Sequence, residues 1–320
     1  MKSNIDNNIL KIFNIKNYVI YFVFIIIFVF FSITLFNKGF LTLSNLMNIA
    51  RQTTMSSVMA IGMTFVLAAG EIDLSIGSVV ALASLITALA LRNYNIWVAI
   101  IAGLGTGAII GIVNGLFVTR LGIPSFLITL GMMGIVSGLA RWITNLAPIS
   151  VTNNVYNFIF GSGNIGPISV LFIWTVVLMA LGQLFLKKTP FGRYVLATGG
   201  NKVAAKFSGI KVNNIKMAVL VTNGVMAALA GMLYTGRLHG ARYTLGEADL
   251  MTVIGAVIIG GTSLFGGKAT VIGSVIGSLI MGMINNGLIL MGLTVAQQMI
   301  FKGIIIIIAV SLSSREAREE

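Results

Sequence analysis

MAIGMTFVLAAGEIDLSIGSVVAL, residues 59–82, decides the class of the fold. Two apolar runs flank a short polar segment that holds Glu71 and Asp73, although the whole chain has only 8 acidic residues. Between Lys11 and Ser314, the only other acidic residues are Glu247 and Asp249, with the same Glu-x-Asp spacing. Acidic residues between long apolar runs are unusual, and the function of the protein must account for both places.

The composition places the rest of the chain in the same class. The 320 residues are 57% hydrophobic and 9% charged, with a mean hydropathy of +0.99, whereas soluble domains carry about 25% charged residues. The absence of cysteine and the single histidine, His239, exclude a thiolate metal site, a cysteine nucleophile and a histidine cluster. The net charge of +13 is explained by membrane topology, so we expect no nucleic-acid partner.

Apolar stretches predict a single transmembrane domain over residues 1–320, an all-α integral membrane protein with about ten helices. A membrane-crossing helix needs about 20 apolar residues. The predicted spans are 18–36, 53–70, 74–91, 96–118, 124–144, 168–186, 215–236, 250–265, 269–291 and 297–313. Most Lys and Arg residues then fall on the side of the chain ends and of the loop 187–214, which predicts cytoplasmic N and C termini.

The two Glu-x-Asp pairs follow the second and seventh spans, which run in opposite directions. This order favours an inverted repeat, with spans two to five in one half and spans seven to ten in the other. The same topology puts Glu71 and Asp73 on the opposite side from Glu247 and Asp249, which argues against one shared catalytic site of paired carboxylates.

Glycines recur every four residues along the fourth span, at Gly103, Gly107, Gly111 and Gly115. Such a stripe is typical of close helix packing. An alternative function is a surface that slides during gating.

TPFGRYVLATGGNKVAAKFSGI, residues 189–210, lies within the only long cytoplasmic loop that we predict. Pro190 ends the preceding helix, and Gly199, Gly200 and Asn201 are expected to form a turn. Asn201 then caps a short helix over Lys202–Ser208, which Gly209 ends. The basic residues of this loop suit anionic lipid, but a small apolar knob on a rigid stalk suits insertion into a partner protein better.

Five segments resemble one family of membrane proteins and occur in its order: MAIGMTFVLAAGEIDLSIGSVVAL (59–82), LGIPSFLITLGMM (121–133), GRYVLATGGNKVAAKFSGIKVNNIK (192–216), IIGGTSLFGGKATVIGSVIGSLIMGMINNGLILMG (258–292) and QQMIFKGIIIIIAV (297–310). Over roughly residues 46–311, the chain resembles the ABC transporter permeases of the ribose/xylose-type monosaccharide uptake family. Within this resemblance the chain departs at Glu71, where the family often has Gly, and at Ser137, where it usually has Arg. Leu250 and Thr252 stand where the family's Glu-x-Asp is expected.

The resemblance implies a multi-pass permease subunit in a bacterial cell membrane. Its implied partners are a second permease copy, a cytoplasmic ABC ATPase and an extracytoplasmic sugar-binding protein. The implied ATPase-coupling residues are Gly192, Arg193, Gly199, Gly200, Asn201, Ala204, Ala205, Ser208 and Gly209.

ATP hydrolysis is expected on the partner subunit, with no cofactor and no enzymatic activity in this chain. GTSLFGGKAT, residues 261–270, has Gly267 at the lysine position of a Walker A loop that starts at Gly261, and Lys268 is followed by Ala269. We predict a tight cytoplasmic turn there.

Polar residues within the apolar spans are candidates for a translocation path or gate: Glu71, Asp73, Ser75, Asn114, Thr129, Asn285, Asn286 and Gln298, together with Asn223. For any one of the polar residues within a helix, a hydrogen bond to a neighbouring helix is the favoured role. Asp73 or Ser75 could cap the helix that follows; alternatively, the chain breaks within the membrane and the carboxylates bond sugar hydroxyls or a gate partner. Two other transport functions stay open: an ion-coupled secondary transporter, and an ABC permease for a nucleoside.

Overall fold

The structure is a computed structural model that describes residues 19–316 and the side chains of residues 19–311. Helices lie at all ten predicted positions: α2 (Val19–Thr34), α3 (Leu43–Ala68), α4 (Ile76–Asn93), α5 (Ile96–Arg120), α6 (Ser125–Thr144), α8 (Val170–Lys188), α11 (Val212–Leu238), α12 (Asp249–Ile259), α13 (Val271–Leu290) and α14 (Val295–Glu316). Within the described residues, six of them (α4, α5, α6, α8, α11 and α13) are long and apolar enough to cross a membrane by length and composition. Residues 1–18 and 317–320, whose charges entered the predicted orientation, lie outside the described part.

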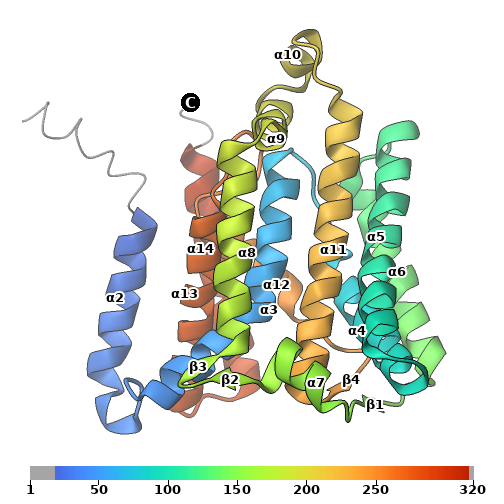
Figure 1. The fold of residues 1–320 in the computed structure, drawn as a ribbon. Coiled ribbons are helices and arrows are strands. Elements are labelled where there is room, and N and C mark those ends of the chain that lie inside the picture. Colours follow the sequence, from blue (N-terminus) through green and yellow to red (C-terminus); the bar gives the residue numbers. More distant parts are fainter. Residues whose placement is uncertain (1–18, 317–320) are drawn as a thin grey trace, which may run out of the picture.

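Two ends of the bundle differ in structure (Figure 1). At one end, α9 (Pro190–Gly200) and α10 (Lys202–Phe207) follow α8. We call this the α10 end. At the other, here the strand end, β1 (Ile149–Ser150) pairs antiparallel with β4 (Gly240–Ala241), and β2 (Asn164–Ile165) with β3 (Ile168–Ser169). α7 (Asn154–Asn157) and η3 (Phe158–Ser162) complete this end, and η2 (Phe36–Lys38) follows α2.

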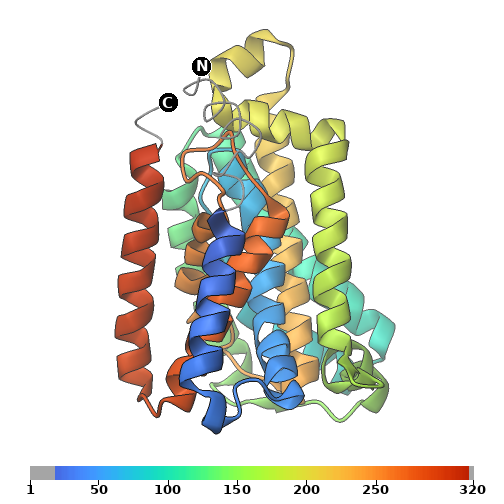
Figure 2. The ribbon, with the colours of Figure 1, turned by 90° about the vertical axis from the view of Figure 1, so that its left-hand side faces the viewer.

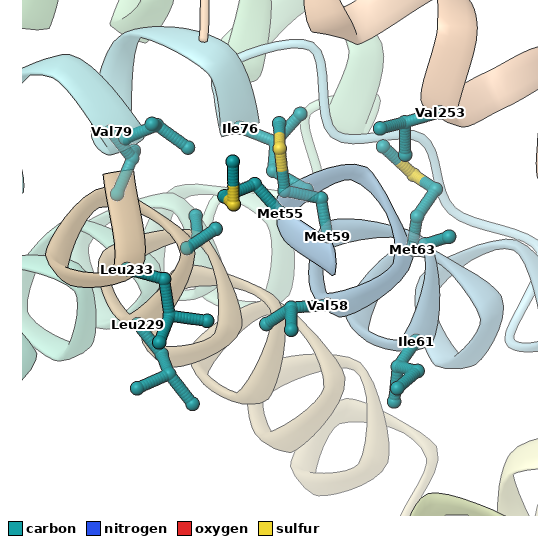
Figure 3. Packing of buried hydrophobic residues seen from close by; sticks show 14 of the residues in the cluster. Met55, Val58, Met59, Ile61, Met63, Ile76, Val79, Leu229, Leu233 and Val253 are labelled. Carbon is teal, nitrogen blue, oxygen red and sulfur yellow. The ribbon is translucent and has the colours of Figure 1, made fainter. Parts of the chain in front are cut away.

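α3 lies at the centre of the bundle, in contact with α8, α11, α12 and α13. Residues 53–69 of the chain are all buried. Its buried methionines, Met55, Met59 and Met63, pack among side chains of α4, α11 and α12 (Figure 3). α3 begins ten residues before the predicted span at 53, because its exposed and half-buried first part carries Ser44, Asn45, Asn48 and Arg51, which interrupt the apolar run.

The glycine stripe of α5 packs against α11. A Cβ atom on Gly111 would lie 2.7 Å from the carbonyl oxygen of Leu220, and one on Gly107 would overlap the carbonyl oxygen of Gly224. The predicted packing role of the stripe is therefore confirmed, because the two backbones touch. A sliding motion stays a prediction.

α12 ends earlier than the predicted span 250–265. Its 11 residues correspond to about 16 Å, or half of the hydrocarbon thickness of a bilayer. The chain leaves the helix at Gly260, where a Cβ atom would lie 2.5 Å from the backbone nitrogen of Ser274, and Gly261 follows with a φ of 85°. Residues 261–270 then form a loop at the α10 end.

Peripheral helices cover this core. α2 packs on α13, α6 on α4, and α14 on α12. The start of α2 and the end of α14 lie at the α10 end, while α9 lies across that end of the bundle (Figure 2).

Candidate functional site

The Glu-x-Asp segment between α3 and α4 is buried inside the bundle. Glu71 is 5% exposed and Asp73 is 2% exposed. Gly70, with a φ of 75°, turns the chain out of α3, and residues 71–75 pass between helices before α4 begins at Ile76. The break between the two helices therefore lies within the bundle. That it also lies within the membrane stays a prediction.

Asp73 organises this break through three hydrogen bonds. Its Oδ1 accepts from the backbone nitrogen of Ser75 at 2.9 Å and from the Ser75 hydroxyl at 2.6 Å. Its Oδ2 accepts from Nδ2 of Asn223 on α11 at 2.9 Å. Ser75, in turn, accepts from Nδ2 of Asn114 on α5 at 3.1 Å. Asp73 thus fixes the residue before α4, whereas the Ser75 side chain makes no capping bond.

Helix α6 satisfies the backbone of the same segment. The Ile72 nitrogen donates to the Ser125 hydroxyl at 3.0 Å, and the Leu74 nitrogen donates to the Thr129 hydroxyl at 3.0 Å. The Thr129 hydroxyl donates to the Ile72 carbonyl at 3.2 Å. An unpaired N–H group inside a membrane protein is costly, so α6 makes the break possible.

Glu71 forms an ion pair with Lys216 of α11, and both side chains are largely shielded, at 6% and 14% exposure. Lys216 and Asn223 lie two helical turns apart on α11, so one face of this helix holds both carboxylates of the break. Six of the nine candidate path residues are therefore brought together: Glu71, Asp73, Ser75, Asn114, Thr129 and Asn223. Neither the hydrogen bond of Ser125 nor the ion pair of Lys216 was predicted from the sequence. The only signal for the ion pair was a lysine beside an apolar stretch.

Gly62 of α3 makes room for this arrangement. A Cβ atom on Gly62 would lie 2.6 Å from Oδ1 of Asn223 and 2.9 Å from Cβ of Met226. We expect Gly62→Ala to turn Asn223 away from Asp73 and to destabilise the protein by about 1–3 kcal/mol. Thermal unfolding in detergent measures this, with Gly105→Ala of α5 as control, since no atom lies within 4 Å of a Cβ there. Equal unfolding temperatures for the two variants would contradict the role of Gly62.

The second Glu-x-Asp segment has the same geometry at its start. Gly246, with a φ of 82°, precedes Glu247 as Gly70 precedes Glu71. Glu247 pairs with Arg141 of α6 at 2.7 Å, and the Tyr234 hydroxyl donates to Oδ2 of Asp249 at 2.6 Å. Neither pairing was predicted, because the residues are distant in sequence.

The first turn of α4 packs on the turn that precedes the second segment. A Cβ atom on Gly77 would lie 2.5 Å from the carbonyl oxygen of Gly246 and 3.5 Å from Cα of Glu247. α4 therefore starts beside the turn that leads into α12. That the two pairs belong to opposite sides of the membrane stays a prediction.

Three predicted path residues lie elsewhere, towards the strand end. Asn286 exchanges two hydrogen bonds with Asn45 of α3, at 2.9 and 3.0 Å. Gln298 donates to the Leu293 carbonyl at 2.9 Å, and the buried Oδ1 of Asn285 has no hydrogen-bond partner. These side chains are separate from the break.

The loop 187–214 forms the short helix that the sequence predicted. Oδ1 of Asn201 accepts from the backbone nitrogens of Val203 and Ala204, at 3.0 and 2.9 Å, and Gly209 has a φ of 81°. α10 is thus capped at its start and ended by a glycine. Phe207 is 89% exposed at its tip.

Gly199 and Gly200 do not form the predicted turn, because both lie in the last turn of α9. A Cβ atom on Gly199 would overlap the carbonyl oxygen of Ala68, at the end of α3, and would lie 2.8 Å from the Gly267 nitrogen. The Gly267 nitrogen also donates to Ala68 at 3.0 Å. α9 therefore packs directly on the residues that lead into the break.

The other predicted coupling residues divide by exposure. Arg193, Gly200, Asn201, Ala204, Ser208 and Gly209 are exposed, whereas Gly192 and Ala205 are buried. A hollow of about 330 Å³ lies beside α10, lined by Tyr194, Ser208, Gly209, Ile210, Lys211, Asn214 and Ile215. Ser208 and Gly209 of the exposed set line this hollow.

Comparison with known proteins gives consistent matches over most of the chain. Residues 45–310 match the family described as "Branched-chain amino acid transport system / permease component". The ribose import permease protein RbsC of Bacillus subtilis (strain 168) is 39% identical over 89% of this chain and 89% of its own length. The xylose transport system permease protein XylH of Haemophilus influenzae is 32% identical, over 97% and 99%. The L-arabinose ABC transporter permease protein AraH of Azospirillum brasilense is 33% identical, over 90% and 84%. No solved structure matches the chain.

Proposed function

Because the chain belongs to the family of branched-chain amino acid transport system permease components, we propose that it is the membrane subunit of an ATP-driven importer that carries a monosaccharide into a bacterial cell. Ribose, xylose and arabinose are the substrates in the names of its relatives, and an aldose of this size is the substrate class that we assign. A nucleoside stays as the alternative cargo for the same machinery.

The proposed topology has ten membrane-crossing helices with the α10 end in the cytoplasm. Basic residues of the loop 187–214 support this orientation, since Lys and Arg are enriched in cytoplasmic loops. An inverted repeat relates α3–α6 to α11–α14. Its support is the same order of elements in both halves, with a left-handed glycine before each Glu-x-Asp break.

One observation carries the proposed coupling: a short helix, capped at both ends, presents an apolar tip at the α10 end. Phe207 is 89% exposed and Val203 is 64% exposed. Apolar side chains this exposed mark an interaction site, and these two would fit an apolar groove on a cytoplasmic ATPase. ATP and Mg²⁺ belong to that partner. A sugar-binding protein would dock at the strand end, and a second copy would complete the pathway.

We expect Phe207→Asp combined with Val203→Asp to weaken the complex with the cognate ATPase at least tenfold and to abolish sugar-stimulated ATP hydrolysis. Burying two carboxylates in an apolar groove is strongly unfavourable. Leu121→Asp is the matched control, because Leu121 is also an exposed apolar residue, 64% exposed, at the same end of the bundle but on another loop. Co-purification and ATPase activity in proteoliposomes measure both effects.

Undiminished sugar uptake by the Phe207→Asp, Val203→Asp variant, with no ATPase bound, would overturn this proposal. The chain would then be an ion-coupled transporter, and the buried Glu71 and Asp73 would become its candidate ion site.

A further inference from the structure

A polar hollow of about 430 Å³ lies at the strand end, where the chain turns from α2 into α3 (Figure 1). Cavities of this size hold small ligands. Its lining comes from η2, from the residues around the start of α3 and from the last residue of α13. We call it the basic hollow, and it is lined by Lys38, Gly39, Thr42, Ser44, Asn45, Asn48, Arg51 and Leu290. The lining contains two cationic side chains and no carboxylate.

Neither cationic side chain of the basic hollow has an acidic partner within residues 19–311. Lys38 is exposed and takes part in no ion pair or side-chain hydrogen bond there. Arg51 donates from Nη2 to Oδ1 of Asn164 on β2 at 2.7 Å, which orients its guanidinium and uses one of its five N–H groups. The hollow therefore carries two positive charges that no carboxylate balances, and an anion is the ligand that they favour. Each of the four described carboxylates is bound elsewhere: Glu71 by Lys216, Asp73 by Asn223, Glu247 by Arg141 and Asp249 by Tyr234.

Neutral hydrogen-bond donors complete the lining. Ser44, Asn48 and Arg51 lie on one face of α3, because they are spaced by four and three residues. Among the described residues, neither the Ser44 hydroxyl nor Nδ2 of Asn48 donates to an acceptor. Together with Lys38, this face presents N–H and O–H donors around two positive charges, which is the donor set that phosphate oxygens bind.

The shape of the basic hollow is fixed by packing beneath it. Phe40 is fully buried, and its ring centre lies 5.6 Å from that of Phe31 and 6.1 Å from that of Phe28. Nδ2 of Asn45 donates to the Phe40 carbonyl at 2.9 Å, and the paired bonds of Asn45 and Asn286 tie α3 to α13. A ligand therefore meets a preformed site, which lowers the entropic cost of binding.

Apolar side chains adjoin the basic hollow. Leu290 forms part of its wall, and Phe36, Leu41, Leu43 and Ile289, which neighbour lining residues in the sequence, are exposed. The end of an apolar helix such as α2 is also the level at which lipid headgroups lie in a bilayer. A soluble anion needs only the charged part of this surface, whereas a phospholipid uses both parts.

We propose that the basic hollow binds the phosphodiester of an anionic phospholipid, whose acyl chains lie on the apolar side chains beside it. Lys38 and Arg51 contact the phosphate oxygens, and Ser44 and Asn48 donate to the phosphate or accept from headgroup hydroxyls. Because the lining comes from three segments, the lipid would fasten the end of α2 to α3 and α13. Lys38 precedes residues 45–310, which match the family, and the site is independent of the transported sugar.

Two double variants of the full chain in detergent test the charges. Lys38→Gln with Arg51→Gln removes both cations of the hollow. Arg92→Gln with Arg242→Gln is the matched control, because both arginines are exposed and lie at the strand end, at the end of α4 and after β4, but outside the lining. Native mass spectrometry and unfolding temperature are measured with phosphatidylglycerol, with neutral phosphatidylcholine and with inorganic phosphate at the same concentration. Capture of the cognate sugar-binding protein is measured in parallel.

A third variant, Ser44→Glu, keeps every hydrogen bond of the turn and adds a carboxylate to the lining. An acidic residue in the first turn of a helix is favourable, so the lipid-free unfolding temperature should not fall. Loss of lipid binding in this variant would therefore not reflect loss of the fold.

We expect phosphatidylglycerol to remain bound to the native chain and to raise its unfolding temperature, and phosphatidylcholine and inorganic phosphate to do neither. The Lys38→Gln, Arg51→Gln variant should bind phosphatidylglycerol about thirtyfold more weakly, because each basic residue near an anionic lipid contributes about fivefold. Ser44→Glu should show a similar loss, and the control should keep the native affinity.

Equal stabilisation by the two lipids, or equal losses in the hollow variant and the control, would overturn the inference. Inorganic phosphate acting as strongly as phosphatidylglycerol would make the hollow a site for a free anion. Weaker capture of the sugar-binding protein with unchanged lipid affinity would make it a protein-docking surface. Either of these results refutes the lipid site.

Discussion

Gly199→Ala is expected to disable the protein, whereas Gly200→Ala one residue later is expected to be tolerated. The new Cβ at position 199 would overlap the carbonyl oxygen of Ala68 and crowd the Gly267 nitrogen, so α9 must move away from α3. A Cβ at position 200 would lie 3.7 Å from Cα of Gly267, which is an ordinary contact. Both glycines are helical, so alanine brings no backbone strain at either position.

The expected cost of Gly199→Ala is about 3 kcal/mol, at the upper end for overpacking, since the obstacle is backbone rather than a side chain. Thermal unfolding in detergent and sugar-stimulated ATPase activity measure it. We expect a lower unfolding temperature and at least a tenfold loss of stimulated activity at position 199 alone. Equal losses in both variants would favour the turn that the sequence predicted over the packing contact.

The second large effect is expected from Lys216→Met, which leaves the Glu71 carboxylate buried without its partner. Removing one member of a buried ion pair costs about 3–5 kcal/mol, whereas replacing both members by neutral groups is often harmless. The double variant Glu71→Gln, Lys216→Met should therefore recover most of the stability lost in Lys216→Met. Unfolding temperatures of the native chain, both single variants and the double variant form the required cycle.

A double variant as unstable as Lys216→Met would show that the lysine acts through packing instead. Its stem would then contribute the stability by covering apolar surface, and the charge of Glu71 would be irrelevant. Lys216→Arg separates the two cases further, because it keeps the charge and changes the shape.

Local features of the fold could be predicted from the sequence, and features set by distant contacts could not. Asn201 and Gly209 define α10 through bonds within a few residues, so its prediction was confirmed. The role of Gly199 depends on Ala68 and Gly267, which only the fold brings near. The same holds for the ion pair of Arg141 and Glu247, because the sequence shows two charged residues but not that the fold brings them into contact.

Hydropathy also fails in a systematic way. It detects continuous apolar helices, so α5 was placed almost to the residue, while the start of α3, which carries several polar side chains, was missed. The predicted span for α12 also extends past Gly260 and Gly261, because glycines can end a helix without ending an apolar stretch of sequence.

The partnership between the break and α11 has a consequence for biosynthesis. Asp73 bonds Asn223, which follows it by 150 residues. At a synthesis rate of about 5–20 residues per second, the ribosome needs on the order of ten seconds to produce that partner. During this interval the nascent first half must keep both carboxylates hydrated at the membrane surface or protonated within it. We therefore expect the break to reach its final arrangement only after α11 has been made, and a chain that ends before Val212 to leave Asp73 without Asn223 and Glu71 without Lys216.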